Sequence, residues 1–331
     1  MITCCYNQQE VVGDAFRAML AQDYHPLEIV ISDDCSQDET YTVLQRIAAD
    51  YAGPHKIVLN RNPRNLGIAA HIDRVTELAS GEFIVGGAGD DVSLPDRVSR
   101  FAEAWIASNR QALVIHGACI LLDNDGGDRQ VARPPAAIRK TPSPIQFVQQ
   151  GMYVIGANMG WSKQLNAHFG PVARHALVED HVLPFRAALL GQIAYIDEPL
   201  VRKRPGGMAD LAVPENGHDS LFGLYLKELP WKIADLRQFR SDLDRVDRKD
   251  KKRILKVVRR TEALHKMEYR MAKAGFGRRL SMFPGEAVRS IWNGHRTRLK
   301  RALYYAAAPL STWLIDRKMR RSDISGQAPA T

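Results

Sequence analysis

Two acidic residues follow directly on an apolar run near the start of the chain. Asp33 and Asp34 come after LEIVIS, residues 27–32, and lead into a helical pattern. In an open parallel sheet, ligands bind outside the carboxyl ends of the strands, so such a strand would place both carboxylates at a binding edge. They could equally cap the turn that follows them. Taken alone, this pair predicts either a polar site at a strand end or a capped turn.

A second acidic pair ends another apolar run. Asp90 and Asp91 stand in GGAGDDVSLPDR, after glycines at positions 86, 87 and 89. Glycine lets a backbone approach a ligand closely, and adjacent carboxylate oxygens suit Mg²⁺ or Mn²⁺ holding a diphosphate. Capping of a helix that begins near Ser93 is the alternative. Two acidic strand ends in one sheet favour the binding interpretation.

A third acidic pair, Glu179 and Asp180, opens a helical pattern in ALVEDHVLPFRAALLG. A carboxylate held near a substrate hydroxyl could act as a general base. Acidic residues in the first turn of a helix also interact favourably with the helix dipole, so a purely structural role is the alternative.

The acidic pairs lie within an alternation of strands and helices. Apolar runs typical of strands covered on both faces occur at residues 27–32, 56–59, 82–85 and 112–115. Helical stripes separate these runs. This order predicts an α/β domain with a Rossmann-like, mostly parallel sheet flanked by helices on both faces.

Local signals set the expected ends of the helices. Ser36 with Glu39 has the form of a capping box before one helix, and Ser93 with Pro95 would open another. A stripe over residues 68–79 predicts a helix between them. Farther along we expect helices at 144–150, 162–169 and 177–190, a strand at 193–196, and mostly helix after residue 221.

Composition indicates a globular chain with two electrostatically different parts. The 331 residues are 45% hydrophobic and carry a formal net charge of +9. Residues 245–321 hold about 23 Lys and Arg against about six Asp and Glu, so the remainder is acidic overall. The four cysteines have no zinc-site spacing, and we find no signal peptide and no apolar run of about 18 residues. A reducing cytoplasm, without an unaided membrane span, is expected.

Four motifs in order resemble glycosyltransferase family 2, the inverting family with the GT-A fold. Tyr6 and Asn7 in CCYNQQEVVGDAF look like its opening element, and MLAQDYHPLEIVISDDCSQDET resembles its signature through the first acidic pair. NPRNLGIAAHIDRVTELASGEFIVGGAGDD is similar to its path from an Asn-x-Gly turn to the acidic metal motif, and ALVEDH is similar to its Glu-Asp motif. The resemblance covers residues 2–208 and is to bacterial cell-surface polysaccharide glycosyltransferases.

The resemblance implies a role for each matching residue. Asp34, with Asp33 nearby, would accept a hydrogen bond from the nucleotide base, expected to be uracil, and Asp180 would be the catalytic base. Asp90 and Asp91 would lie by the diphosphate and a divalent metal, Mn²⁺ or Mg²⁺. The implied nucleotide-binding residues are Tyr6, Asn7, Asp33, Asp34, Arg64, Asn65, Gly67 and Asp90, with a solvated loop position as the alternative for Arg64.

The chain also departs from the family pattern. Ala88 stands where the family has the first Asp of its Asp-x-Asp motif, and Asp73 replaces a common Asn. Arg202 and Arg204 follow the Glu-Asp helix without the His often found nearby, and the first strand is short. These departures motivate one alternative, a catalytically inactive relative that binds a nucleotide or a glycan.

A GT-A domain is therefore expected over residues 1–220, followed by a basic, mostly helical region over residues 221–331. Within the domain, residues 1–123 would form the nucleotide-sugar half and residues 124–220 the acceptor half. The basic region mixes many cations with aromatic residues, which suits an anionic membrane surface. Its apolar stretch at 302–315 has the length of an interfacial segment.

The expected function is transfer of a sugar from a nucleotide-diphosphate sugar, a UDP-sugar, to a hydroxyl of a glycan or lipid-linked glycan. Asp180 would take the proton of that hydroxyl as its oxygen attacks the anomeric carbon, which would invert the configuration. We expect a cytoplasmic enzyme, peripheral on the inner face of the membrane. A nucleic-acid-binding protein that uses the basic region is a further alternative; it is not favoured, because no reading motif is present.

Overall fold

The computed structural model of the protein describes residues 1–139, 142–150, 154–172, 179–205 and 218–273. The chain forms two compact units, one of residues 1–211 and 234–261 and the other of residues 212–233 and 262–331. Every residue expected in a site belongs to the first unit. The domain boundary after residue 220 stays a prediction, and the helical residues 234–261 belong to the same unit as the sheet. The apolar stretch 302–315 and the rest of 274–331 lie outside the described residues.

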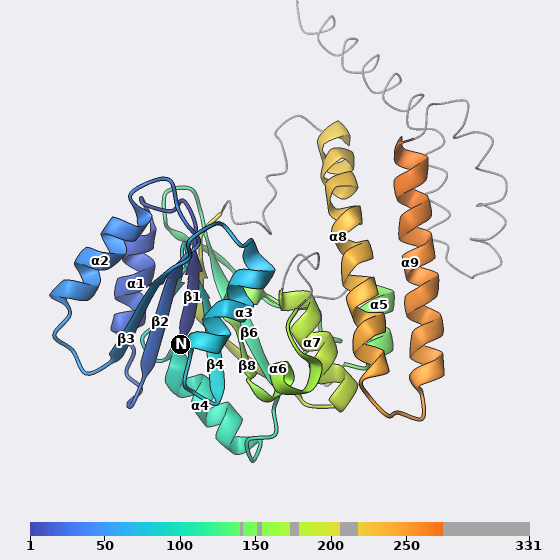
Figure 1. Ribbon diagram of the computed structural model, residues 1–331, viewed down its shortest axis with the longest axis horizontal. Coiled ribbons are helices and arrows are strands. Elements are labelled where there is room, and N and C mark those ends of the chain that lie inside the picture. The colour runs from blue at the N-terminus through green and yellow to red at the C-terminus, as the bar shows by residue number, and fades with distance from the viewer. Residues whose placement is uncertain (140–141, 151–153, 173–178, 206–217, 274–331) are drawn as a thin grey trace, which may run out of the picture. The chain divides into compact units, whose positions relative to one another are not determined.

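A nine-stranded sheet organises the described part of the first unit, in the order β3-β2-β1-β4-β8-β6-β9-β5 with β7 paired to β6 (Figure 1). The strands are β1 (Ile2–Cys5), β2 (Glu28–Asp33), β3 (Lys56–Arg61), β4 (Phe83–Ala88), β5 (Val92–Ser93), β6 (Val114–Leu122), β7 (Asp128–Ala132), β8 (Met159–Ser162) and β9 (Ile193–Lys203). Strands β3, β2, β1 and β4 pair in parallel. Beyond β4 the sheet is mixed, since β8 is antiparallel to both β4 and β6. The α/β fold class is confirmed.

Helices cover both faces of this sheet. The helices of the described residues are α1 (Val12–Leu20), α2 (Thr40–Asp50), α3 (Ile68–Leu78), α4 (Arg97–Ala107), α5 (Pro144–Gln150), the short 3₁₀ helix η1 (Gly156–Asn158), α6 (Gln164–Phe169), α7 (Glu179–Leu190), α8 (His218–Asp244) and α9 (Lys251–Lys273). Helices α1, α2 and α4 pack with Ile29 and Ile31 of β2, whereas α3, α6 and α7 contribute to the cluster that contains Val30. Successive strand residues point to opposite faces, which explains the continuous apolar run of β2.

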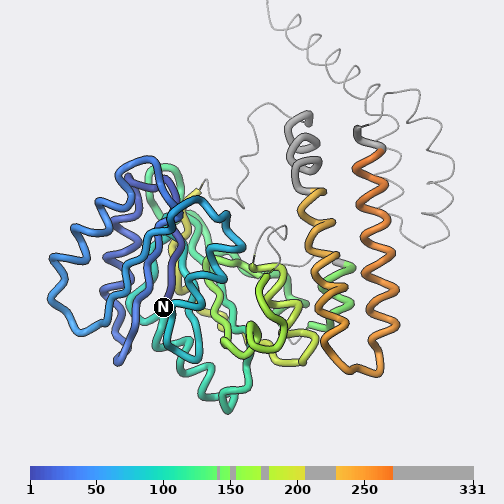
Figure 2. The backbone as a smooth tube through the Cα atoms, in the orientation of Figure 1, coloured from blue at the N-terminus to red at the C-terminus, as the bar shows by residue number. Residues whose placement is uncertain are grey.

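Strand register brings the carboxyl ends of β1, β2 and β4 to one edge. Cys5 of β1 lies opposite Asp33 of β2, and Cys4 lies opposite Ala88 of β4. Figure 2 shows β1, near the N-terminus, running between these two strands, although β4 comes much later in the chain. Because parallel strands end at the same edge, the acidic residues after β2 and β4 leave the sheet together.

Most expected elements are confirmed with shifted ends. The four expected strands correspond to β2, β3, β4 and the start of β6, and the strand expected at 193–196 opens β9. Helix α5 has the expected bounds, α6 begins two residues later than expected, and α7 covers the described part of the third helix. Helices α8 and α9 confirm a helical chain after residue 221 within the described residues.

The expected capping box before α2 is wrong. Helix α2 begins at Thr40, and the Ser36 hydroxyl accepts a hydrogen bond from the backbone N–H of Asn7 at 2.9 Å instead of capping the helix. Asp38 accepts from the backbone N–H of Thr40 at 3.0 Å. Ser36 therefore ties the segment after β1 to the loop after β2, a long-range contact that a local motif cannot reveal.

Ser93 does not open a helix either. It lies in β5, where its backbone pairs with Val201 of β9, and helix α4 begins only at Arg97. The Ser93 hydroxyl accepts a hydrogen bond from Nη1 of Arg97 at 2.9 Å. The expectation is wrong because an antiparallel partner much later in the chain uses this backbone.

A buried ion pair joins α7 to the last turns of α8. Arg186 donates from Nε to Oδ2 of Asp242 at 2.9 Å, and both side chains are fully buried. The same guanidinium donates to the carbonyl oxygens of Gly170 and Pro171 at 2.9 and 3.1 Å. Gln238 donates to Oδ1 of Asp242 at 2.8 Å. Because these bonds satisfy both charges, the pair fixes α8 against the helix that begins with Glu179.

We expect Arg186→Met to lower the free energy of unfolding by about 3–5 kcal/mol, because it leaves the Asp242 carboxylate buried without its partner. Urea unfolding of the full chain measures the change. The double variant Arg186→Met/Asp242→Leu should recover most of the loss, since it removes both charges. The matched control is Arg253→Met, at an exposed position of α9. A loss below about 1 kcal/mol in the single variant would mean that the pair is no more important than a surface ion pair.

Candidate active site

Carboxylates surround the end of β1. Burial raises the pKa of the thiols of Cys4 and Cys5, and neighbouring negative charges raise it further. The carboxylates responsible are those of Asp34 and Glu179 for Cys4 and of Asp33 and Asp90 for Cys5. Residues from all three acidic pairs thus come within electrostatic range of two consecutive residues of one strand.

Asp34 is buried and organises the loop between β3 and α3. Its Oδ1 accepts hydrogen bonds from Nδ2 of Asn62 at 2.8 Å and from the backbone N–H of Leu66 at 2.9 Å. Its Oδ2 accepts from the backbone N–H of Gly67 at 3.0 Å. Gly67 has a φ of +78°, a conformation that glycine adopts readily. Asp34 therefore positions this loop, and its hydrogen bond to a nucleotide base stays a prediction.

The other residues expected to bind nucleotide near this edge lie in or beside that loop. Asn65 accepts a hydrogen bond from the backbone N–H of Gly67 at 2.9 Å, and Arg64 is exposed. Asp33 is buried, with Oδ2 accepting from the backbone N–H of Ser36 at 3.0 Å and lying 3.2 Å from Nε of Arg61. Turn capping, the alternative role considered for this pair, accounts for one oxygen of Asp33.

Arg204, at the end of β9, holds the second acidic motif. Its Nη1 donates to the backbone carbonyl of Asp90 at 2.8 Å, and its backbone N–H donates to Oδ1 of Asp91 at 3.0 Å. Its Nη2 donates to Oδ2 of Asp14 in α1 at 2.8 Å. Asp91 is buried, whereas Asp90 is half-buried. Burial first, and then the charge of Asp90, raises the pKa of Asp91 to about 7.

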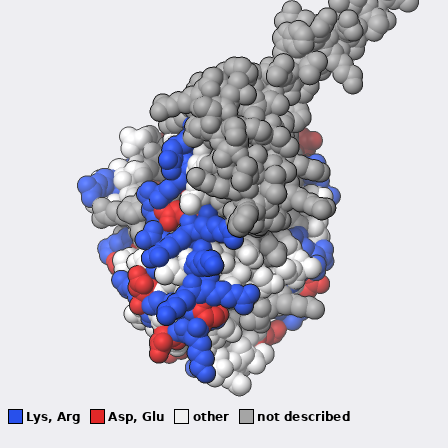
Figure 3. Space-filling view, turned by 90° about the vertical axis from the view of Figure 1, so that its right-hand side faces the viewer, with Lys and Arg blue, Asp and Glu red and all other residues white. Residues whose placement is uncertain are grey.

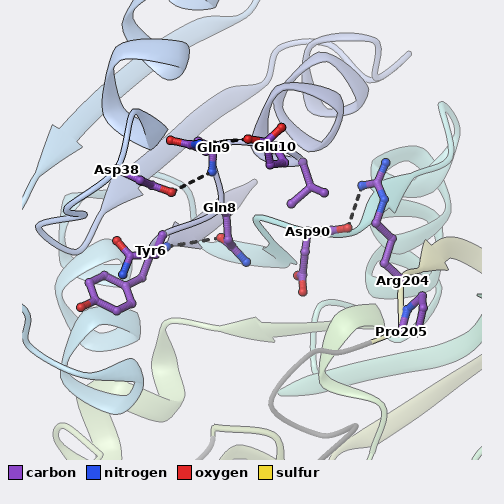
Figure 4. Close-up of a pocket in the computed structure, with 10 residues that line it drawn as sticks. Tyr6, Gln8, Gln9, Glu10, Asp38, Asp90, Arg204 and Pro205 are labelled. Carbon is purple, nitrogen blue, oxygen red and sulfur yellow. Dashed lines mark hydrogen bonds between the residues drawn. The ribbon is translucent and has the colours of Figure 1, made fainter. Parts of the chain in front are cut away.

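A pocket of about 610 Å³ opens beside this motif. Its lining consists of the continuous segment Tyr6–Val11 together with Asp38, Asp90, Arg204 and Pro205. Figure 4 shows Asp90 between Tyr6 on one side and Arg204 with Pro205 on the other, with its carboxylate directed away from the guanidinium. Gln9 is held by Asp38, whose Oδ2 accepts from the backbone N–H of Gln9 at 3.1 Å. The pocket therefore combines an aromatic side chain, amides and charges of both signs.

Protein side chains take the space beside the three glycines before Asp90. A Cβ on Gly86 would lie 2.7 Å from the Trp161 ring, and one on Gly87 would lie 2.8 Å from the Thr3 hydroxyl. A Cβ on Gly89 would lie 2.2 Å from the Gln8 side chain. The expectation that these glycines leave room for a ligand is corrected: Gly86 and Gly87 let β4 pack against its neighbours, and Gly89 leaves room for the Gln8 side chain.

The third acidic pair begins α7, as expected. Burial, and then the charge of Asp180, raises the pKa of Glu179 to about 7, and burial also raises the pKa of Asp180. A Cβ on Gly156 of η1 would lie 2.9 Å from Oδ2 of Asp180. The next residue of η1, Ala157, accepts a hydrogen bond at 2.8 Å from Arg97, which also donates to the backbone of β4. Asp180 therefore packs against a short helix that is bonded to the strand leading to Asp90.

The donor set suits a divalent metal held jointly with a substrate. Within the described residues, no group of three or more His, Cys, Asp and Glu side chains could hold a metal ion. Mg²⁺ commonly takes only one or two protein carboxylates, with phosphate oxygens and water as its other ligands. Asp90 supplies such a carboxylate at the pocket, with the buried Asp91 next to it in the chain, while Ala88 supplies none. The residues therefore fit a metal that binds together with a diphosphate.

The predicted residues fall into three groups. Tyr6, Asn7 and Asp90 line the pocket. Asp33, Asp34, Arg64, Asn65 and Gly67 belong to the neighbouring loops without lining it, and Asp91 is buried behind Asp90. Asp180 lies at the start of α7, beside Glu179. Sequence reasoning missed the pocket roles of Gln8, Gln9, Asp38 and Arg204, although Asp38 stands in the first acidic motif and Arg204 in a basic cluster.

Solved structures show which fold this is. The chain superposes on residues 1–349 of S. aureus TarS in complex with UDP with a TM-score of 0.60, at 14% identity over 99% of this chain and 92% of that one. It superposes on the mannosyltransferase PcManGT from Pyrobaculum calidifontis, solved with GDP-Man and Mn²⁺, with a TM-score of 0.54, at 16% identity over 93% and 85% of the two chains. The fold is that of the GT-A glycosyltransferases.

The sequence of the N-terminal part matches a known family. Residues 1–151 match the model described as glycosyl transferase family 2. A relative is the GalNAc(5)-diNAcBac-PP-undecaprenol beta-1,3-glucosyltransferase of Campylobacter jejuni, 29% identical over 37% of this chain and 38% of the relative. The chain spans about two fifths to just over half the length of the curated relatives that it matches.

Proposed function

We propose that the protein transfers a sugar from a nucleotide-diphosphate sugar to an acceptor hydroxyl, with inversion at the anomeric carbon. The observation that carries this proposal is an open polar pocket lined by Asp90, together with the packing of Asp180 against η1, which Arg97 bonds to β4. The family 2 domain and the GT-A fold support the same class of reaction.

In this mechanism Asp180 is the general base. It accepts the proton of the acceptor hydroxyl while that oxygen attacks the anomeric carbon and the nucleotide diphosphate departs from the opposite face. Burial raises the pKa of Asp180, which makes its carboxylate a stronger base than an exposed one. The proton on the acceptor therefore has a destination within the protein.

Asp90 and Arg204 act on the donor. Asp90 would hold a divalent metal, Mn²⁺ or Mg²⁺, and such a metal would supply positive charge to stabilise the departing phosphate oxygens. Arg204 fixes the backbone of Asp90 and contributes a guanidinium to the pocket lining. The binding of Mn²⁺ by PcManGT is consistent with this assignment.

The donor is a uridine diphosphate sugar. Tyr6 is 44% exposed at the pocket and offers a ring face on which a base can stack. The amides of Asn7 and Gln8 offer donors and acceptors for a ribose or a base. TarS 1–349, which shares the fold, was solved with UDP.

Turnover separates this proposal from a relative that only binds a nucleotide. With Mn²⁺ present, we expect the full chain to release UDP from at least one UDP-sugar of a panel, slowly without an acceptor and faster with one. UDP release is followed by a coupled assay, and UDP binding by thermal shift, because a ligand of the folded state raises its apparent stability. A protein that UDP stabilises, but that releases none from any donor, would be a binding module.

The acceptor is a glycan or lipid-linked glycan met at an anionic membrane surface on the cytoplasmic side. The exposed cations in the first ten residues of α9 are Lys252, Arg253, Lys256, Arg259 and Arg260, opposite the buried Ile254 and Val258. Figure 3 shows Lys and Arg side chains gathered on the side of the molecule where α9 lies. The Campylobacter jejuni relative is named for a substrate linked to undecaprenol. No helix of the described residues is long and apolar enough to cross a membrane.

Charge reversal on α9 tests the membrane contact. We expect Lys252→Glu/Lys256→Glu/Arg259→Glu to weaken partitioning onto phosphatidylserine-containing vesicles at least about 100-fold, because each cation near such a surface contributes about 1 kcal/mol. Co-sedimentation with vesicles at fixed ionic strength measures the effect.

The matched control is Arg46→Glu/Arg74→Glu/Arg110→Glu, which reverses three exposed cations outside α9 and lowers the net charge by the same amount. This control should keep most of the wild-type partitioning. Equal losses in both triple variants would show that net charge alone drives binding. Salt-dependent binding to RNA without binding to vesicles would favour a nucleic-acid partner instead.

A further inference from the structure

His181 is held by a carboxylate from outside the family 2 segment. Its Nδ1 lies 2.7 Å from Oδ2 of Asp235 in α8, and only 5% of the Asp235 side chain is exposed. Its Nε2 lies 4.0 Å from Oδ1 of Asp180. The imidazole therefore lies between the expected base and a second, buried carboxylate, both within the first compact unit.

The short contact to Asp235 sets the state of the ring. A carboxylate accepts from Nδ1–H, which leaves Nε2 directed towards Asp180. Two carboxylates near one imidazole favour its protonated form, because an opposite charge within about 4–6 Å stabilises the charged state. The separation of 4.0 Å to Asp180 is too long for a hydrogen bond, so His181 acts on that carboxylate chiefly through its charge.

Asp180 needs such a charge. Burial raises its pKa, the charge of His181 lowers it, and the charge of Asp235 raises it. Within the described residues, Oδ1 of Asp180 is buried and has no hydrogen-bond partner. Without a neighbouring cation, the pKa of this carboxyl would be higher still, and less of it would be ionised and able to accept a proton from an acceptor.

We propose that His181, oriented by Asp235, is a positioning residue that keeps the Asp180 carboxylate ionised and therefore able to act as the base. This inference rests on the proposed function, since it gives a role to a residue that acts through Asp180. It also assigns part of the catalytic site to α8, which lies beyond the family 2 segment of residues 1–151.

Asp180 precedes the ring on α7 and Asp235 faces it from α8, and the charge of Glu179, also on α7, interacts with that of the ring. In the wild type, transfer should fall as the pH drops through the pKa of Asp180, because the base is then protonated. Loss of the His181 charge raises that pKa, so the acidic limb of the pH profile must move to higher pH.

We expect His181→Gln to move the acidic limb of kcat upward by about one pH unit, a size typical of a single charge at this distance. Below the limb the variant should be about tenfold slower than the wild type, and above it the two rates should converge. Convergence at high pH cannot come from a misfolded variant. His181→Lys, which restores a cation, should move the limb back, whereas His168→Gln, at an exposed position of α6, should leave it unchanged.

The titration of His181 itself gives a second measurement, independent of turnover. By NMR of the ¹³C-labelled ring, we expect the pKa of His181 to fall by about one unit in Asp235→Asn and in Asp180→Asn, because each change removes a negative charge beside the ring. If the wild type turns over no donor, the proposed function fails, but this titration still tests the interaction of His181 with Asp180 and Asp235. An unmoved acidic limb in an active His181→Gln enzyme, or an unmoved His181 titration in both Asp variants, would overturn the inference.

Discussion

Asp180→Asn should abolish most transfer while leaving donor binding intact. Asparagine has nearly the same shape and keeps a carbonyl oxygen against Gly156, but it cannot accept the proton of the acceptor hydroxyl. We expect kcat to fall by about 10²–10⁴-fold, the usual contribution of a general base. Steady-state transfer from a UDP-sugar measures kcat, and isothermal titration measures the affinity for UDP.

The matched control is Asp50→Asn, at the exposed C-terminal end of α2, which should behave like the wild type. The residual rate of Asp180→Asn should also lose the acidic limb of its pH profile, because the group that titrates there is gone. A variant that keeps more than about a tenth of the wild-type kcat would assign the base to another residue. Glu179, which lies beside Asp180 and has a pKa raised to about 7, would be tested next.

The residues that end parallel strands were the most predictable part of the site. Asp33 and Asp90 could be placed near one another from sequence alone, because an apolar run followed by acidic residues marks a strand end and parallel strands share that edge. The pairing of β1 with both β2 and β4 supports this reasoning. The α/β class followed from the same alternation of apolar runs and helical stripes.

What each carboxylate does at that edge could not be predicted in the same way. Asp34 and Asp90 look alike in sequence, yet Asp34 is buried under the backbone N–H groups of the loop before α3, while Asp90 lines the pocket. That difference arises from chain segments that the fold brings together, so the residues next to Asp34 and Asp90 in the sequence do not reveal it. Local signals failed for the same reason at Ser36 and Ser93, whose partners lie far along the chain.

The contributions of late segments were hidden for a related reason. Arg204 reaches Asp14 and the backbone of Asp90 from the end of β9, and Asp235 reaches His181 from α8. Both are charged residues in charged surroundings, where composition suggests only a solvated surface. Their partners are fixed by the packing of β9 and α8, which spacing along the chain does not determine. A helix after the family 2 segment therefore contacts a residue of the candidate site, through Asp235 and His181.

Asp90→Asn should uncouple donor binding from the metal. The wild type should bind UDP more tightly when Mn²⁺ is added, because a metal held by Asp90 would also bind phosphate oxygens. An amide is a weaker ligand for a hard cation and carries no charge, so in Asp90→Asn the enhancement by Mn²⁺ should largely vanish. We expect kcat/KM to fall by about 10²–10³-fold, as when one preorganised electrostatic contact to a transition state is lost.

The neighbouring acid provides the contrast for this experiment. Asp91 is buried and accepts a hydrogen bond from the backbone N–H of Arg204, so Asp91→Asn should alter stability more than the response to Mn²⁺. Titrations of UDP with and without Mn²⁺ on both variants, beside their urea unfolding curves, separate the two roles. If Mn²⁺ tightens UDP binding equally in the wild type and in Asp90→Asn, the metal is not held by Asp90. The positive charge that balances the negative diphosphate would then have to come from the chain itself. Arg204, which lines the same pocket, is placed to supply it.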